Sequence, residues 1–245
     1  MPSGPFSFRI SMALLGHASR YIISSADPVA SRSAWEDIGF VDNGSSETVV
    51  RLTDGQILLS LLPTEPAPLA LAYFTPSLQS TGDRLVAAGI EISGSNATGW
   101  HMHGPGQLDW WIHPATPATV EQRSGEGSPL LGYVDAVVVP CEDVHTAAEW
   151  AQLVGYFIAD QWDSPMPQVD LTDGLVNLSF RKQAAGAPFF HYTADIDEEW
   201  VEAATEAAGE RLKLHHDAMG HVTLAIFTMP DGCTIMVTPD EFPTA

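Results

Sequence analysis

The chain has 245 residues, 45% of them apolar and 17% charged, which is the composition of a folded globular protein long enough for two domains. Its 31 acidic and 10 basic residues give a net charge of −21, which argues against nucleic acid and an anionic membrane surface as partners. The acidity fits either a solvated surface suited to high salt or an electrostatic field that attracts a cationic ligand.

The first half of the chain is predicted to alternate strands and helices. Residues 19–26 form an apolar, β-branched run that ends in an acid, and a helical segment containing Trp35 follows it. An Asp-Gly pair marks the turn of a hairpin over residues 47–62. The remaining elements are a strand over 69–74, a helix over 78–88 and a closing hairpin over 101–113.

The second half of the chain repeats this order. Leu52-Thr53-Asp54-Gly55 recurs 119 residues later as Leu171-Thr172-Asp173-Gly174, and Trp150 matches Trp35. Matches in a constant order indicate a duplication. The repeated elements are a strand over 134–141, a helix with Trp150, a hairpin over 168–182, a strand over 189–194, a helix over 197–208 and a hairpin over 221–237. We expect one domain over 1–120, a linker over 121–129 and a second domain over 130–245.

The cysteines and the apolar runs indicate a cytoplasmic protein. Cys141 and Cys233 are far apart, so a disulfide framework has no support, and both are expected to be small core residues. No stretch has the pattern of a signal peptide or the length of a membrane span. We expect a monomer or a homodimer without a membrane partner.

The order strand, helix, strands, repeated twice in each half as βαβββ units, resembles the vicinal oxygen chelate superfamily of glyoxalases, bleomycin-resistance proteins and extradiol dioxygenases. The resemblance covers about residues 16–115 and 130–240. Its specific motifs are the strand-acid-helix-aromatic opening and Met229-Pro230-Asp231-Gly232, which is similar to the family's Asp-Pro-Asp-Gly turn. It implies an α+β fold of two tandem glyoxalase-like domains, each with two βαβββ modules in a cup-shaped mixed sheet and helices outside.

The resemblance also implies where metal ligands would lie. Metal-binding members carry one ligand on the first strand of a domain, one on the middle strand and a Glu on the closing strand. The matching residues here are Asp135, His191 and Met236 in the second half, and Arg20, Leu71 and Trp111 in the first half. A thioether is a poor partner for Fe, Mn, Ni or Zn, and two donors leave most of the coordination to water. We therefore expect no bound metal, with a set of Asp135, His191 and His221 as the alternative.

Three groups of side chains are candidates for a ligand site. Asp135 lies in an apolar strand, where a carboxylate is costly unless it faces a pocket. His191, flanked by aromatic residues, is a metal ligand, a hydrogen-bonding group of a pocket or a core histidine. The run from His215 to His221 reads as a loop, in which His216 and His221 are site candidates and His215 belongs to a solvated turn.

The closing hairpin of the first half concentrates aromatic and imidazole side chains. Alternation along the strand sends Asp109, Trp111 and His113 to one face and Trp110 to the other. Aromatic faces in a cleft suit a planar or cationic guest, although packing in the core explains them equally well.

Two functions fit these observations. The first is metal-independent binding of a small hydrophobic, aromatic or cationic compound, as in drug or natural-product sequestration. The alternative is a metal-dependent or cofactor-free dioxygenase, lyase or isomerase in which Asp135 and His191 act as acid and base. Whether the protein is an enzyme stays open at this point. The expected ligand-contacting residues are Arg20, His103, Trp111, Asp135, Phe189, His191, His216, His221 and Met236.

Overall fold

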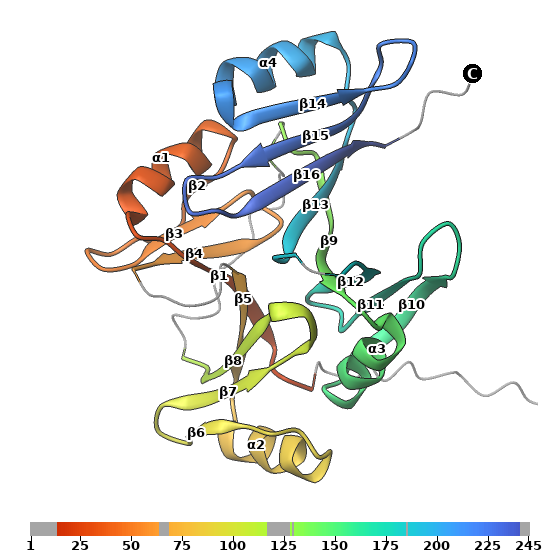
Figure 1. Cartoon of the computed structure of the whole chain (residues 1–245). Coiled ribbons are helices and arrows are strands. Elements are labelled where there is room, and N and C mark those ends of the chain that lie inside the picture. Colours follow the sequence, from red (N-terminus) through yellow and green to blue (C-terminus); the bar gives the residue numbers. More distant parts are fainter. Residues whose placement is uncertain (1–13, 64–68, 117–127, 129, 185, 241–245) are drawn as a thin grey trace, which may run out of the picture.

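The computed structural model describes residues 14–63, 69–116, 128, 130–184 and 186–240. Its strands form two eight-stranded mixed sheets, one from each half of the chain (Figure 1). The predicted α+β fold of two tandem glyoxalase-like domains is confirmed. Within the described ranges, no helix is long and apolar enough to cross a membrane. The predicted linker 121–129 lies, apart from Ser128, outside the described residues.

The N-terminal sheet has the strand order β2-β3-β4-β1-β5-β8-β7-β6. β1 and β5 pair antiparallel at its centre, and each of them begins one βαβββ module. The strands are β1 (Ala18–Ser24), β2 (Val41–Asp42), β3 (Val50–Thr53), β4 (Leu58–Leu62), β5 (Leu69–Thr75), β6 (Ser93–Ser95), β7 (Gly99–His103) and β8 (Asp109–Pro114), and the helices are α1 (Pro28–Asp37) and α2 (Leu78–Ala87).

The C-terminal sheet repeats this topology in the order β10-β11-β12-β9-β13-β16-β15-β14. β9 and β13 take the central antiparallel positions. The strands are β9 (Tyr133–Cys141), β10 (Phe157–Trp162), β11 (Gln168–Thr172), β12 (Asn177–Lys182), β13 (Phe189–Ala194), β14 (Leu212–His216), β15 (Val222–Thr228) and β16 (Thr234–Pro239), and the helices are α3 (Val144–Leu153) and α4 (Glu198–Ala208).

Aspartate caps fix the starts of three helices. Asp27 accepts hydrogen bonds from two backbone N–H groups of the first turn of α1, and Asp143 does the same at α3. Asp197 caps α4 by accepting a hydrogen bond from the backbone N–H of Trp200. Asp143 therefore lies between the end of β9 and the start of α3, as Asp27 lies between β1 and α1.

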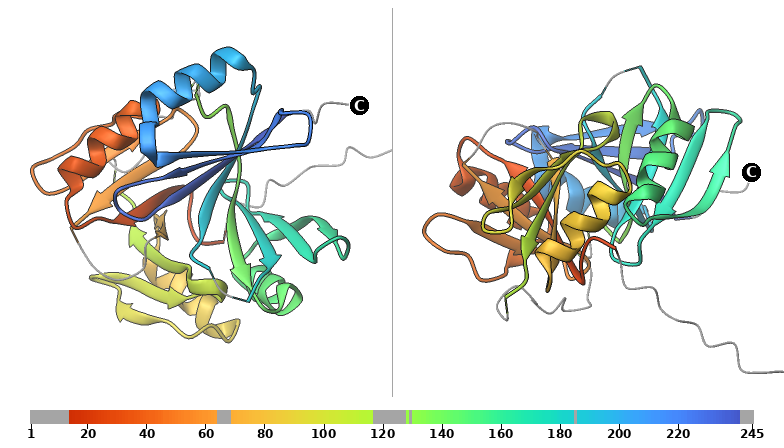
Figure 2. Two further views of the ribbon diagram at one scale, coloured as in Figure 1. Left: turned by 45° about the horizontal axis from the view of Figure 1, so that its top comes forward. Right: turned by 90° about the horizontal axis from the view of Figure 1, so that it is seen from below.

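One face of each sheet contributes to a common apolar core between the domains. Phe190 of β13 packs edge to face against Tyr21 of β1 and Trp35 of α1. Trp110 of β8 packs in the same way against Tyr156, which follows α3. In consequence α1 and α4 lie side by side although they belong to different domains (Figures 1 and 2). The opposite faces carry polar side chains, and they hold the candidate sites.

Two buried tyrosine–aspartate contacts join the domains reciprocally. Tyr192 donates a hydrogen bond to Asp54 Oδ2 at 2.8 Å, and Tyr73 donates one to Asp173 Oδ2 at 2.7 Å. Asp54 also accepts two backbone N–H groups of its own turn, at Gln56 and Ile57. The repeated Leu-Thr-Asp-Gly motif thus shapes a hairpin turn and holds the other domain, and burial of the tyrosine hydroxyls raises their pKa.

Three details of the predicted layout are wrong. The strands β2, β6, β10 and β14 are missing from the predicted elements. His215 and His216 lie on β14 and not in a loop. The residue that corresponds to His191 is Ala72 and not Leu71, because Ala72 pairs with Trp111 of β8 as His191 pairs with Met236 of β16.

Candidate functional site

The most developed polar arrangement lies on the polar face of the C-terminal sheet and joins three strands. His191 Nδ1 lies 2.8 Å from Asp135 Oδ2, and His191 Nε2 lies 3.1 Å from Thr238 Oγ1. The imidazole side chain is 11% exposed and the carboxylate 53%. The three residues form a chain of carboxylate, imidazole and hydroxyl whose carboxylate end is open to solvent.

A β-bulge brings Asp135 to His191. His191 pairs with Ala136, whereas the next residue of β13, Tyr192, pairs with Val134. Asp135 is therefore the additional residue of β9, and a bulge of this kind redirects a side chain that regular alternation would send elsewhere. The backbone carbonyl of Asp135 accepts a hydrogen bond from the Asn177 side chain, which holds the bulged segment against β12.

The surroundings of Asp135 favour its ionised form. Its hydrogen bond with His191 lowers the pKa of the carboxyl group, and the positive charge of Arg181 adds to this effect. Arg181 is itself partly buried, and its charge interacts electrostatically with Asp170 as well as Asp135. Ser179 accepts a hydrogen bond from Arg181 Nε at 3.2 Å. An ionised Asp135 fixes Nδ1 of His191 as the protonated nitrogen and leaves Nε2 as a proton acceptor.

The family's metal position does not fit a metal here. The strand positions at which the resemblance implies metal ligands carry Asp135, His191 and Met236, and Met236 lies opposite His191 in the parallel pairing of β13 with β16. Met236 offers only a thioether, which is a soft ligand, so Asp135 and His191 are the two suitable donors of this position. The residues of this position therefore suit proton transfer better than metal binding.

The other predicted contact residues are divided among different places. Phe189 precedes His191 on the same face of β13 and is buried. His216 and His221 line a cavity of about 780 Å³ at the ends of β13 and β16, together with Asp195, Asp197, Glu198 and Asp240. His221 contacts Asp217 rather than His191. Among the described residues, Asp135, His191 and His221 do not form a converging donor group.

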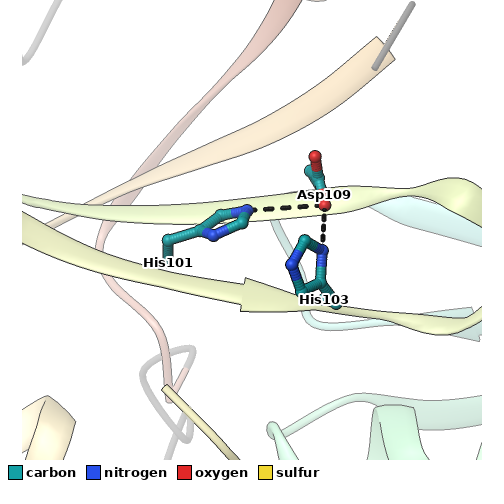
Figure 3. Close-up of side chains that lie close together, drawn as sticks. All are labelled: His101, His103 and Asp109. Atoms are coloured by element: carbon teal, nitrogen blue, oxygen red, sulfur yellow. Dashed lines mark hydrogen bonds and ion pairs between the residues drawn. The ribbon is translucent and has the colours of Figure 1, made fainter. Parts of the chain in front are cut away.

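Arg20, Trp111 and His103 belong to the polar face of the N-terminal sheet. Arg20 pairs with Ala72, which in turn pairs with Trp111, and Arg20 is buried with Nη1 3.2 Å from Ser60 Oγ. Trp111 stacks on His101, and the predicted alternation of Trp110 toward the core and Trp111 toward the polar face is confirmed. His103 lies with His101 and Asp109 at the end of the hairpin (Figure 3).

Sequence reasoning missed Thr238, Arg181 and the grouping of His101 with Asp109. Thr238 stands two residues after Met236, and strand alternation places both on one face of β16. That alternation is the sequence signal that could have identified Thr238. Arg181 has no comparable signal, because its electrostatic interaction with Asp135 depends on how the folded sheet brings the two strands together.

Solved structures with a similar fold include extradiol dioxygenases. A variant of homoprotocatechuate 2,3-dioxygenase from Brevibacterium fuscum matches 92% of this chain and 71% of its own, with a TM-score of 0.61 and 12% identity. The Arthrobacter globiformis enzyme gives 0.59 and 12%, covering 92% of this chain and 79% of its own. A catechol 2,3-dioxygenase gives 0.58 and 13%, covering 94% of both chains. No protein-family model and no curated protein matches the sequence. The matches to solved structures show that the chain has the fold of the vicinal oxygen chelate superfamily.

Proposed function

We propose that this protein catalyses proton transfer on a small organic molecule at the polar face of its C-terminal sheet, without a metal. The observation that carries the proposal is the chain of Asp135, His191 and Thr238. It has the geometry of a general base with an orienting carboxylate. The Asp135 carboxylate holds Nδ1 of the imidazole, and Nε2 faces the exchangeable hydroxyl proton of Thr238.

In this proposal His191 is the base, and Asp135 stabilises the imidazolium that forms when Nε2 takes a proton. Thr238 either passes that proton through its hydroxyl or yields its position to the substrate. Arg181, a partly buried cation, interacts electrostatically with Asp135 and helps to keep that carboxylate ionised. This set of groups suits a carbonyl compound with an acidic C–H, which is the chemistry of a lyase or an isomerase.

The test follows exchange of a substrate proton for deuterium. The full chain, treated with a chelator, is incubated in D₂O with pyruvate, 2-oxobutyrate or acetylacetone, and loss of the α-proton signal is followed by ¹H NMR. We expect exchange that falls at least ~100-fold in His191→Ala, because general-base catalysis typically contributes about 10²–10⁴-fold. Asp135→Asn is expected to lower the rate, and His145→Ala, which changes an exposed histidine on α3, is the matched control.

Two results would oppose this proposal. Exchange that is equally fast in His191→Ala places the chemistry elsewhere. Consumption of O₂ with catechol or homoprotocatechuate only after Fe²⁺ or Mn²⁺ is added would support the metal-dependent alternative.

Metal-independent binding without chemistry is the second candidate function. The observation that favours it is the cavity of about 780 Å³, lined by four carboxylates, which suits a cationic compound. Titration with a cationic aromatic antibiotic, followed by tryptophan fluorescence and calorimetry, separates the two candidates. Binding that weakens in Asp197→Asn and is unchanged in His191→Ala, with no exchange in D₂O, would favour sequestration.

A further inference from the structure

A second group of donor atoms lies in the other domain, on the hairpin of β7 and β8. His103 Nδ1 lies 2.7 Å from Asp109 Oδ1, and His101 Nε2 lies 3.4 Å from the same oxygen. Figure 3 shows both imidazoles directed toward this one carboxylate oxygen. Each of the three side chains offers a ligand atom, and these atoms all lie within 4.8 Å of one another. Within the described ranges, no other group of three or more His, Cys, Asp or Glu side chains meets this criterion.

The strand pattern explains why the three side chains converge. His101 and His103 are two residues apart on β7, so both side chains lie on one face of the strand. His103 pairs directly with Asp109 across the hairpin. The intervening turn includes Gly106 and Gln107, both at φ +66°, and it fixes the register that places His103 opposite Asp109.

The ring of His101 is held in place without a hydrogen-bond partner for Nε2. It stacks on Trp111 with ring centroids 4.2 Å apart, and His103 meets it edge to face at 4.5 Å. Nε2 is buried, and its 3.4 Å contact with Asp109 lacks hydrogen-bond geometry. A buried imidazole nitrogen without a hydrogen-bond partner is unfavourable. Nε2 of His101 therefore needs a partner other than the described protein groups.

We infer that His101 Nε2, His103 Nδ1 and Asp109 bind a divalent transition-metal ion. Imidazole with carboxylate suits Zn²⁺, Ni²⁺, Cu²⁺ or Fe²⁺ rather than Ca²⁺ or Mg²⁺. Bonds of about 2.0–2.2 Å at octahedral to tetrahedral angles place donor atoms about 3.0–3.5 Å apart, which requires only small movements here. Three protein donors leave a position for water, and the side chain of His103 is 80% exposed, so solvent reaches the ion.

This site differs from the family's metal position and from the proposed C-terminal site. In the N-terminal sheet the family's strand positions carry Arg20, Ala72 and Trp111, none of which is one of the three donors. The residues of the C-terminal sheet that correspond to His101, His103 and Asp109 are Ile226, Thr228 and Thr234. The inference therefore concerns one domain only, and it does not rest on the proposed proton transfer.

The test measures Zn²⁺ binding to the chelator-treated full chain by competition with a chromophoric chelator. We expect one equivalent of Zn²⁺ with a dissociation constant below about 10 μM. Removing a ligand is expected to weaken binding by more than the roughly 10- to 100-fold that follows loss of an outer hydrogen-bond partner. The variants are His101→Ala, His103→Ala and the nearly isosteric Asp109→Asn, with far-ultraviolet circular dichroism to show that each is folded.

Two control variants make the result specific. His113→Ala changes a histidine on the same hairpin that stacks on Trp111 without being a donor, and His191→Ala changes the C-terminal site. Both are expected to bind Zn²⁺ like the unchanged chain. Co²⁺ supplies a second readout, since its visible absorption bands are expected to disappear in Asp109→Asn and to persist in His113→Ala. The inference is overturned by binding weaker than about 100 μM, by binding that survives His101→Ala and His103→Ala together, or by equal loss in either control.

Discussion

Replacing Tyr192 by Phe removes one hydroxyl from the contact between the two domains and leaves the aromatic ring in place. Asp54, which accepts this hydroxyl at 2.8 Å, is 3% exposed, so water cannot replace the lost donor. Its other oxygen keeps the two backbone N–H groups of the turn. A buried acceptor that loses its partner costs about 1–3 kcal/mol, and the charge of the carboxylate places the expected loss near 2 kcal/mol.

The assay for Tyr192→Phe is thermal and urea unfolding against a matched control. Tyr133 is 73% exposed, so Tyr133→Phe removes the same hydroxyl from a solvated position and is expected to stay within about 0.5 kcal/mol of the unchanged chain. A loss of about 2 kcal/mol lowers the melting temperature by roughly 4–8 °C in a chain of this size. Tyr192→Phe unfolding at the same temperature as Tyr133→Phe would refute the reasoning.

Three further predictions follow from other parts of the structure. The pKa of Asp135 is lowered chiefly by its hydrogen bond with His191, so its contribution to stability is present above the unfolded pKa of about 3.9 and is lost as pH falls through the lower folded value. Urea titrations at several pH values are expected to show that the difference from Asp135→Asn shrinks below about pH 4. Gly132→Ala is expected to cost more than the roughly 1–3 kcal/mol of a strained backbone, because at φ +75° its Cβ would lie 2.2 Å from the Thr193 carbonyl oxygen. Gly174→Ala, at φ +86° with no atom within 4 Å of the new Cβ, is its control in the same unfolding assay. Burial, assisted by Asp143, raises the pKa of Cys141 to about 11, so native protein is expected to react with iodoacetamide at pH 8 far more slowly than urea-unfolded protein, as mass spectrometry can measure.

The duplication could be predicted because its markers are local. The motif around Asp54 and its counterpart around Asp173 sets a hairpin turn, and turn chemistry is visible in four consecutive residues. The second role of these aspartates was not predictable in the same way. Their partners Tyr192 and Tyr73 lie on distant strands of the other domain, and no local pattern indicates which tyrosine reaches which turn.

The candidate site shows where counting along the sequence fails. Counting singled out Asp135 and His191, which are in contact, and Met236, which pairs with His191, because strand positions are preserved along each module. It assigned Leu71 instead of Ala72 in the first half, since a one-residue error transfers a side chain to the opposite face of the sheet. The contact of Asp135 with His191 depends on a bulge, which adds a residue to one strand only and leaves no mark that spacing can detect.

The two halves carry different side chains at corresponding positions of their polar faces. The reciprocal contacts of Tyr73 with Asp173 and of Tyr192 with Asp54 require each copy to supply both a tyrosine and an aspartate, so a change in either copy breaks a buried contact. The polar faces carry no such reciprocity. His101 and Asp109 have Ile226 and Thr234 as counterparts, and His191 has Ala72, so each proposed site exists in one copy only. A duplicated frame held by a symmetric interface thereby leaves each polar face free to carry different chemistry, and variants of one site are expected to leave the other unchanged.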